Sequence, residues 1–133
     1  IEMLEDEGLD AVYARHHRLA EGVRRAVAAW GMKPCAASAD LYSDTITAVL
    51  VPDGCNGTDL VQLAATKYGV AFGVGLGEVA GKVFRIGHLG MLTDVMVLAG
   101  LATAEMCMAD LGWPVALGSG VAAAQDYYRG TAA

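Results

Sequence analysis

Apolar residues recur every three or four positions through the first quarter of the chain, the spacing of one face of a helix. The members of this stripe are Val12, His16, Leu19, Val23, Ala26, Val27 and Trp30. The pattern predicts a long helix from Gly8 to Gly31. Gly31 is a typical helix stop, and Pro34 follows it at the usual distance.

Further segments alternate between strand-like and helix-like patterns. β-branched and apolar residues at 45–51, 70–74 and after Lys82 predict strands. Helical spacing predicts one helix from a cap at Thr58 or Asp59 to Tyr68, and two more over 94–111 and 119–128. One short extended piece is expected between Lys33 and Asp44. This order predicts an α+β fold, a small and mostly antiparallel sheet with helices packed on it.

A glycine-rich run leads directly into the third strand, which carries one arginine among apolar neighbours. In an alternating strand, Phe84 and Ile86 point to one face, and Val83, Arg85 and Gly87 point to the other. The first face is expected to be core. On the second face, Gly87 is expected to leave room beside the guanidinium of Arg85.

A half-buried arginine needs an anionic partner, because burying an unpaired charge is costly. No acidic residue lies between Arg85 and Asp94. The partner is therefore a distant carboxylate, such as Glu78 or Asp94, or the carboxylate or phosphate of a ligand, which suits the planar guanidinium. The residues alone leave these alternatives open.

Composition narrows the class of protein. The chain has 133 residues, 55% of them hydrophobic, which is enough for one globular domain. A net charge of −6 argues against a nucleic-acid partner. The apolar stretch Val95–Ala109 is interrupted by Glu105 and is too short to span a membrane. Cys35, Cys55 and Cys107 are far apart, which indicates reduced thiols of a cytoplasmic protein.

Two phosphate-binding motifs are excluded by the residues that surround the glycines. Gly75–Ala80 formally matches the G-x-G-x-x-A fingerprint of dinucleotide binding, but that fingerprint needs a helix after the loop, and here the loop leads into a strand. A Walker loop would need glycine and a hydroxyl residue where the chain has Leu76 and Val83. A glycine-rich hairpin is the simpler interpretation.

Other chemistry-bearing side chains favour structural roles. His16 and His17 are adjacent on a helix, which is poor geometry for a metal, and are expected to be solvated. His88 is expected to be a hydrogen-bonded structural residue. No lysine has an obvious desolvated pocket of the kind a Schiff-base lysine needs. The lysines are Lys33, Lys67 and Lys82.

The segment Gly73–Gly90, with its run GLG-x-x-AGKVFRIGHLG, resembles the C-terminal signature of class V aminotransferases of the serine–glyoxylate and alanine–glyoxylate type. Three further segments are similar to that family: Tyr42–Val49, the first helix with its AAWG ending, and Gly120–Tyr128. The resemblance extends over essentially the whole chain.

The resemblance implies a fold-type-I enzyme that uses pyridoxal 5'-phosphate and forms homodimers. Residues 1–133, led by the helix within 1–31, would be the C-terminal small domain. The large domain, with the cofactor and its lysine, would lie outside these residues, so the chain alone is expected to be inactive. Arg85 would bind the substrate α-carboxylate, with Gly75, Leu76 and Gly77 shaping the loop near the substrate.

The implied reaction moves an amino group from a small amino acid to glyoxylate. Serine is the favoured donor, with aspartate or alanine as alternatives. Two rival hypotheses come from other classes of protein. The chain would be a non-catalytic carboxylate-binding or dimerisation module, or a structural domain in which Arg85 pairs with Glu78 or Asp94.

Overall fold

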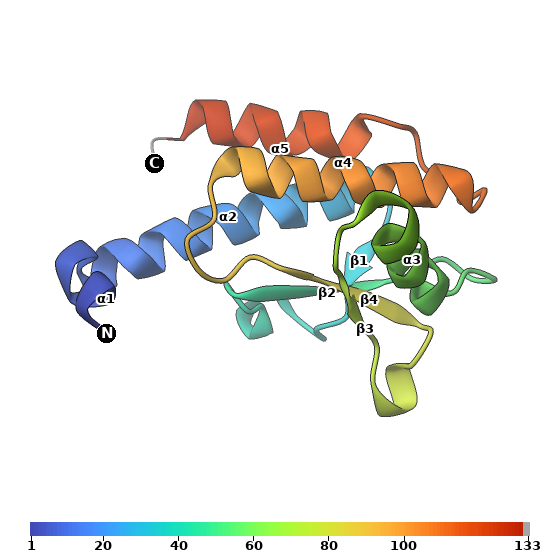
Figure 1. The fold of residues 1–133 in the computed structure, drawn as a ribbon, viewed down its shortest axis with the longest axis horizontal. Coiled ribbons are helices and arrows are strands. Elements are labelled where there is room, and N and C mark those ends of the chain that lie inside the picture. Colours follow the sequence, from blue (N-terminus) through green and yellow to red (C-terminus); the bar gives the residue numbers. More distant parts are fainter. Residues whose placement is uncertain (132–133) are drawn as a thin grey trace.

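The computed structural model describes residues 1–131 as one layer of helices packed on a small sheet (Figure 1). The elements in chain order are α1 (Glu2–Glu7), α2 (Leu9–Ala29), β1 (Lys33–Pro34), η1 (Ala39–Leu41), β2 (Ile46–Leu50), α3 (Gly57–Leu63), η2 (Ala64–Tyr68), β3 (Gly73–Val74), η3 (Gly77–Val79), β4 (Val83–Gly87), α4 (Asp94–Asp110) and α5 (Ser119–Gly130). The predicted α+β class is confirmed.

The sheet has four strands in the order β1-β2-β4-β3, and every neighbouring pair is antiparallel. The hairpin predicted around the glycine loop is β3–β4, although β3 is only two residues long. Directly opposite residues in such a sheet point to the same face. Val49 of β2 lies opposite Phe84 of β4, and both side chains are fully buried.

Helices α2, α4 and α5 lie together on one side of the sheet, the side of Val49 and Phe84 (Figure 1). Apolar residues from α2, α3, α4 and α5 join these two side chains in one core. Phe84 makes edge-to-face contacts with Phe72 and Trp113. The core therefore occupies the space between these helices and one face of the sheet, and α2, α4 and α5 leave the opposite face uncovered.

The buried carboxylate of Glu105 joins α2, α4 and α5. It accepts a 2.8 Å hydrogen bond from the indole of Trp30, at the end of α2. It also accepts backbone N–H bonds from Gly118, Gly120 and Val121, at the start of α5. A carboxylate suits this position because the first N–H groups of a helix have no partner within it. Glu105, which interrupts the apolar sequence of α4, therefore caps the N-terminal end of α5.

Two sequence-based expectations need correction, and a third gains detail. The helix predicted from Gly8 to Gly31 is α2, and within residues 1–31 the short helix α1 precedes it, separated from it at Gly8, whose φ of 82° interrupts the helical backbone. The cap of α3 is Asn56, whose side chain accepts the N–H of Thr58, so Thr58 and Asp59 lie inside the helix rather than capping it. His16 is buried rather than solvated, because its ring bridges the Val12 carbonyl and the Gly90 N–H.

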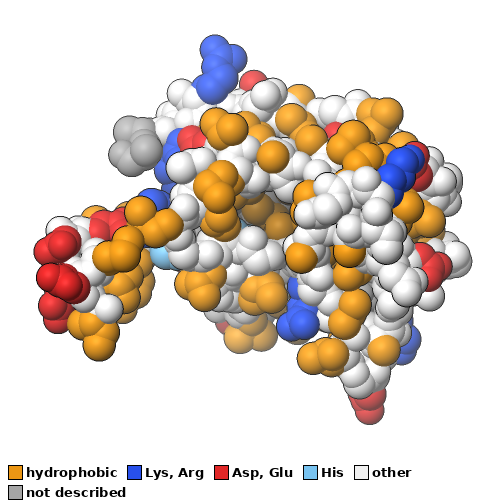
Figure 2. All heavy atoms as spheres, in the orientation of Figure 1, with side chains coloured by type: hydrophobic (Ala, Val, Ile, Leu, Met, Phe, Trp, Pro, Cys, Tyr) orange, Lys and Arg blue, Asp and Glu red, His pale blue; other side chains and the backbone are white. Residues whose placement is uncertain are grey.

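The N-terminal end of the molecule carries both acidic and hydrophobic side chains on its surface. Figure 2 shows them adjacent over α1, where Met3 and Leu4 are exposed. Arg15 of α2 fixes this end by its ion pair with Glu7 and by a hydrogen bond to the Gly90 carbonyl. The loop after β4 and the N-terminal helices are therefore held as one unit.

No helix among residues 1–131 is long and apolar enough to cross a membrane. No cluster of metal-binding side chains occurs in that same range. Cys35, Cys55 and Cys107 are unbonded, and Cys107 is buried while the other two are half-buried. This agrees with the expectation of three separate thiols.

Candidate functional site

Arg85 lies on β4, on the face of the sheet that α2, α4 and α5 leave uncovered. Its neighbours across the sheet are Ala48 of β2 and Gly73 of β3. Ile46 and Leu50, on the same face, are 37% and 39% exposed. The alternation predicted for this strand is confirmed, because Phe84 and Ile86 point into the core. Arg85 thus lies on a largely apolar sheet face, which also carries the exposed Lys33 of β1, opposite Leu50.

The guanidinium of Arg85 is held by the backbone rather than by a carboxylate. Its Nε–H donates to the Val74 carbonyl oxygen at 2.9 Å. Within residues 1–131 no ion pair joins Arg85 to an acid. Asp94 instead takes two hydrogen bonds from Arg18. The hypothesis that Arg85 pairs with Glu78 or Asp94 is therefore wrong for this structure.

The two terminal nitrogens of Arg85 remain open. No hydrogen bond from Nη1 or Nη2 to any described residue occurs. In the described part of the chain, no buried side-chain nitrogen or oxygen lacks a partner, so these two nitrogens reach solvent. A guanidinium with its inner nitrogen anchored and its outer nitrogens open is suited to bind an anion in bidentate fashion.

The glycine loop closes the far end of the β3–β4 hairpin. A Cβ at Gly75 would overlap the carbonyl oxygen of Val79, so the loop closes only around a glycine there. Gly77 has a φ of +55°, which favours glycine. Leu76 is 65% exposed between them. The loop thus exposes an apolar side chain at the end of the hairpin that carries Arg85, and its place near a substrate stays a prediction.

The glycine that gives Arg85 its room is not the expected one. A Cβ on Gly87 would meet nothing within 4 Å, so Gly87 is not required for clearance. A Cβ on Gly73 would lie 3.0 Å from Nε and 3.1 Å from Cβ of Arg85. The reason is the direction of the side chain, which crosses towards β3 instead of following β4. A glycine inside a strand was the available sequence signal for this close approach.

A small pocket lies beside the Arg85 row of the sheet. Its volume is about 180 Å³, and Ala48, the neighbour of Arg85, forms part of its wall. The lining residues are Pro34, Ala36, Leu41, Tyr42, Ser43, Ile46, Thr47 and Ala48. The pocket is mostly apolar, with hydroxyl groups supplied by the segment before β2.

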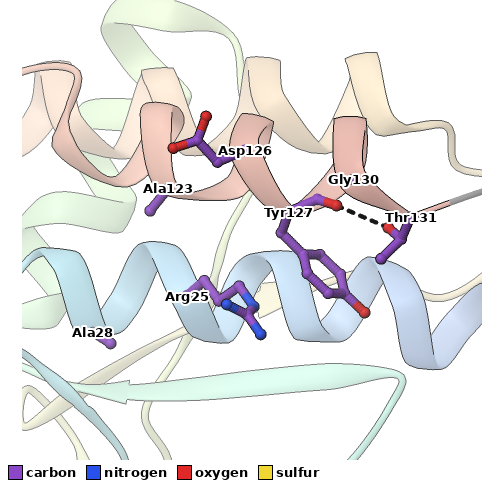
Figure 3. A pocket seen from close by; sticks show the side chains of 7 residues that line it. All are labelled: Arg25, Ala28, Ala123, Asp126, Tyr127, Gly130 and Thr131. Atoms are coloured by element: carbon purple, nitrogen blue, oxygen red, sulfur yellow. Dashed lines mark hydrogen bonds between the residues drawn. The ribbon is translucent and has the colours of Figure 1, made fainter.

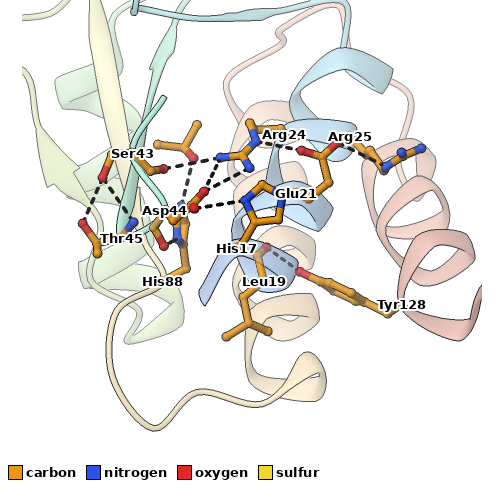
Figure 4. A network of polar contacts seen from close by, with 11 residues as sticks. His17, Leu19, Glu21, Arg24, Arg25, Ser43, Asp44, Thr45, His88 and Tyr128 are labelled. Carbon is orange, nitrogen blue, oxygen red and sulfur yellow. Dashed lines mark hydrogen bonds and ion pairs between the residues drawn. The ribbon is translucent and has the colours of Figure 1, made fainter. Parts of the chain in front are cut away.

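A polar network fixes the segment before β2 (Figure 4). The buried ring of His88 bonds the Thr47 hydroxyl at 2.9 Å and the Asp44 carbonyl oxygen at 3.0 Å. The Asp44 carboxylate accepts from His17 and Arg24 of α2. Burial alone would raise the pKa of Asp44, but these two partners bring it below its ordinary value. The predicted structural role of His88 agrees with this geometry.

A larger hollow, about 610 Å³, lies between α2 and α5 and is separate from the sheet (Figure 3). Arg25 lies over the Tyr127 ring there, with the guanidinium carbon 4.5 Å from the ring centre. Its lining residues all come from α2, α5 and Thr131. It therefore has no part in the arrangement around Arg85.

The lysines of this chain do not fit a pyridoxal phosphate site. Lys67 is exposed and pairs with Asp110 at 2.7 Å. Its hydrogen bonds to Asp110 and Tyr68 raise its pKa, which favours the charged ammonium over the nucleophilic amine. Lys33 is exposed on β1, and Lys82 lies at the turn before β4. A Schiff-base lysine needs a desolvated amine, and none of the three is placed to provide one.

The chain is similar in sequence to known aminotransferases over almost its whole length. No family model matches the chain. The L-aspartate–glyoxylate aminotransferase of Paracoccus denitrificans is 63% identical over 127 residues, 96% of this chain and 32% of that protein. The serine–glyoxylate aminotransferase of Hyphomicrobium methylovorum is 52% identical over 128 residues, again 96% of this chain and 32% of that protein.

The fold leads to the same family. The crystal structure of pyridoxamine–pyruvate aminotransferase from Mesorhizobium loti superposes with a TM-score of 0.91 at 38% identity, covering 98% of this chain and 34% of that one. The chain thus spans about a third of the length of the curated relatives it matches. By sequence and by fold, the chain matches the C-terminal small domain of class V aminotransferases.

Proposed function

We propose that this chain is the carboxylate-binding part of a pyridoxal-phosphate-dependent aminotransferase that transfers an amino group from a small amino acid to glyoxylate. The observation that carries the proposal is Arg85, whose two terminal nitrogens are open on the uncovered face of the sheet. Support for the reaction comes from relatives at 63% and 52% identity that are named for transfer to glyoxylate.

In this proposal Arg85 binds the α-carboxylate of the donor and then that of the acceptor. Two parallel N–H···O bonds fix the orientation of a carboxylate as well as its position. Orientation matters because the reacting bond at Cα must meet the cofactor in one geometry, a positioning effect worth several powers of ten in rate. Pyridoxal phosphate supplies the electron sink for that bond. Since this chain's lysines do not fit the cofactor, its own contribution is binding and orientation.

A large domain that holds the cofactor and its lysine is part of the same proposal. The uncovered sheet face, where Ile46 and Leu50 are exposed on the side of Arg85, is where that domain would close over the substrate. We propose a homodimer in the cytoplasm as the working form. The three unbonded cysteines support a reducing compartment.

The amino donor is serine or aspartate. The higher identity of the aspartate–glyoxylate relative favours aspartate. Aspartate carries a second carboxylate, which needs a cation besides Arg85. The pocket beside Ala48 provides hydroxyl groups and no cation, a lining that suits serine. The ratio of kcat/KM for serine and aspartate decides between the two donors.

Substitution of Arg85 in the complete enzyme tests the proposal. Arg85→Ala is expected to lower kcat/KM about a hundredfold or more for donor and glyoxylate alike, since it removes two charge-assisted hydrogen bonds. Arg85→Lys keeps the charge but loses the pair of parallel hydrogen bonds that the planar guanidinium makes. It should therefore recover only part of the lost kcat/KM. The matched control is Arg129→Ala, which removes an exposed arginine of α5. Near-normal turnover of Arg85→Ala would refute the proposed role.

A further inference from the structure

We propose that Gly73 is a positioning residue for Arg85. Its missing side chain lets the guanidinium lie across the edge strand β3, so that only the end of the guanidinium faces the substrate. This inference rests on the proposed carboxylate-binding role of Arg85 and adds which edge of the guanidinium binds and what holds it there.

The geometry at the edge strand carries the inference. Gly73 lies directly opposite Arg85 in the sheet, so any side chain at position 73 would point to the same face. A Cβ there would lie 3.0 Å from Nε, 3.1 Å from Cβ and 3.4 Å from Cζ of Arg85. Cross-strand Cβ atoms are ordinarily about 4.5–5.5 Å apart. The arginine therefore occupies the space that a side chain at position 73 would take.

The next residue of β3 fixes the orientation. The Val74 carbonyl oxygen accepts the Nε–H of Arg85 at 2.9 Å. An arginine can bind a carboxylate through Nε and one terminal nitrogen, or through both terminal nitrogens. With Nε engaged by the backbone, the second mode remains. β3 thus removes the side-on mode and presents Nη1 and Nη2 together, which reduces the conformational freedom lost on binding.

Gly87 provides a matched control. It lies two residues beyond Arg85 on β4, on the same face of the sheet. A Cβ there meets nothing within 4 Å. Neither Gly73 nor Gly87 has a positive φ, so alanine is compatible with the backbone at both positions. The two substitutions therefore add the same methyl group to the same face, and only one of them meets Arg85.

A double-mutant cycle in the complete enzyme tests the proposal. The variants are Gly73→Ala, Arg85→Ala, the double variant and Gly87→Ala, compared by kcat/KM for the amino donor and by KM and kcat separately. Gly73→Ala is expected to lower kcat/KM about tenfold or more, because it displaces an oriented charged donor. In the Arg85→Ala background the same change should have almost no effect, since the group it displaces is absent. Gly87→Ala should stay close to the parent.

The outcomes separate this inference from the proposed function. If Arg85→Ala itself is harmless, the proposed function fails. If Arg85→Ala is severe while Gly73→Ala is neutral, or lowers kcat/KM equally in both backgrounds, the proposed function stands and the positioning role is refuted. If the Gly73→Ala protein folds poorly, the melting temperatures of the single and double variants test the proposal in place of activity. Recovery of the melting temperature in the double variant supports the overlap with Arg85, and an equal loss in both contradicts it.

Discussion

Polar side chains buried among residues 1–131 connect elements that are distant in the sequence, and each has a hydrogen-bond partner. His88 joins β4 to the segment before β2, and Glu105 joins α4 to α2 and α5. Satisfied groups of this kind stabilise one arrangement, whereas an unsatisfied buried group costs about 1–3 kcal/mol. The position of Arg85 depends on the same kind of contact, a single bond to the Val74 carbonyl.

The pH dependence of stability follows from His88. Burial lowers the pKa of this ring below its ordinary value of 6.5. The unfolded chain therefore binds a proton before the folded one does, and the free energy of unfolding falls as the pH drops below about 6.5. Urea titrations between pH 7 and pH 5 measure this slope. His88→Gln, which cannot titrate, should make the slope shallower, and an unchanged slope would contradict the assignment.

At the scale of elements, hydrophobic periodicity located β2, β4, α4 and α5 to within a few residues. What it could not predict depends on contacts between distant parts. The Glu105 cap of α5 comes from another helix, and the partner of Arg85 is a backbone carbonyl of a two-residue strand. His16 lay on the apolar stripe, yet its solvation was misjudged because its partner, the Gly90 N–H, is 74 residues away. Neighbouring residues carry no signal for such contacts.

The cap of α3 gives a test at this scale. Asn56→Ala removes the side chain that accepts the Thr58 N–H at 2.9 Å. It should lower the free energy of unfolding by about 1 kcal/mol, the usual effect of losing an N-cap. Thr58→Ala is the control, since its side chain lies within the helix and should change stability by less than about 0.5 kcal/mol. Chemical denaturation measures both free energies of unfolding. A larger loss of stability for Thr58→Ala than for Asn56→Ala would show that Thr58 is the capping residue.

For the whole molecule, the contrast between the two faces of the sheet is the main functional feature. One face is covered by helices and supplies the core, and the other presents Arg85 among half-exposed apolar residues. The chain spans about a third of its curated relatives. In our proposal the remaining part of such a protein brings the cofactor to the Arg85 face. One face of the small sheet therefore stabilises the fold, and the other binds the substrate.

The most direct test of this account is a crystal structure of the complete enzyme with its cofactor and an unreactive monocarboxylate inhibitor. The account predicts that the two carboxylate oxygens bind Nη1 and Nη2 of Arg85 while Nε remains on the Val74 carbonyl. The cofactor should be attached to a lysine other than Lys33, Lys67 and Lys82. An inhibitor carboxylate bound elsewhere, with Arg85 free of it, would contradict the central claim.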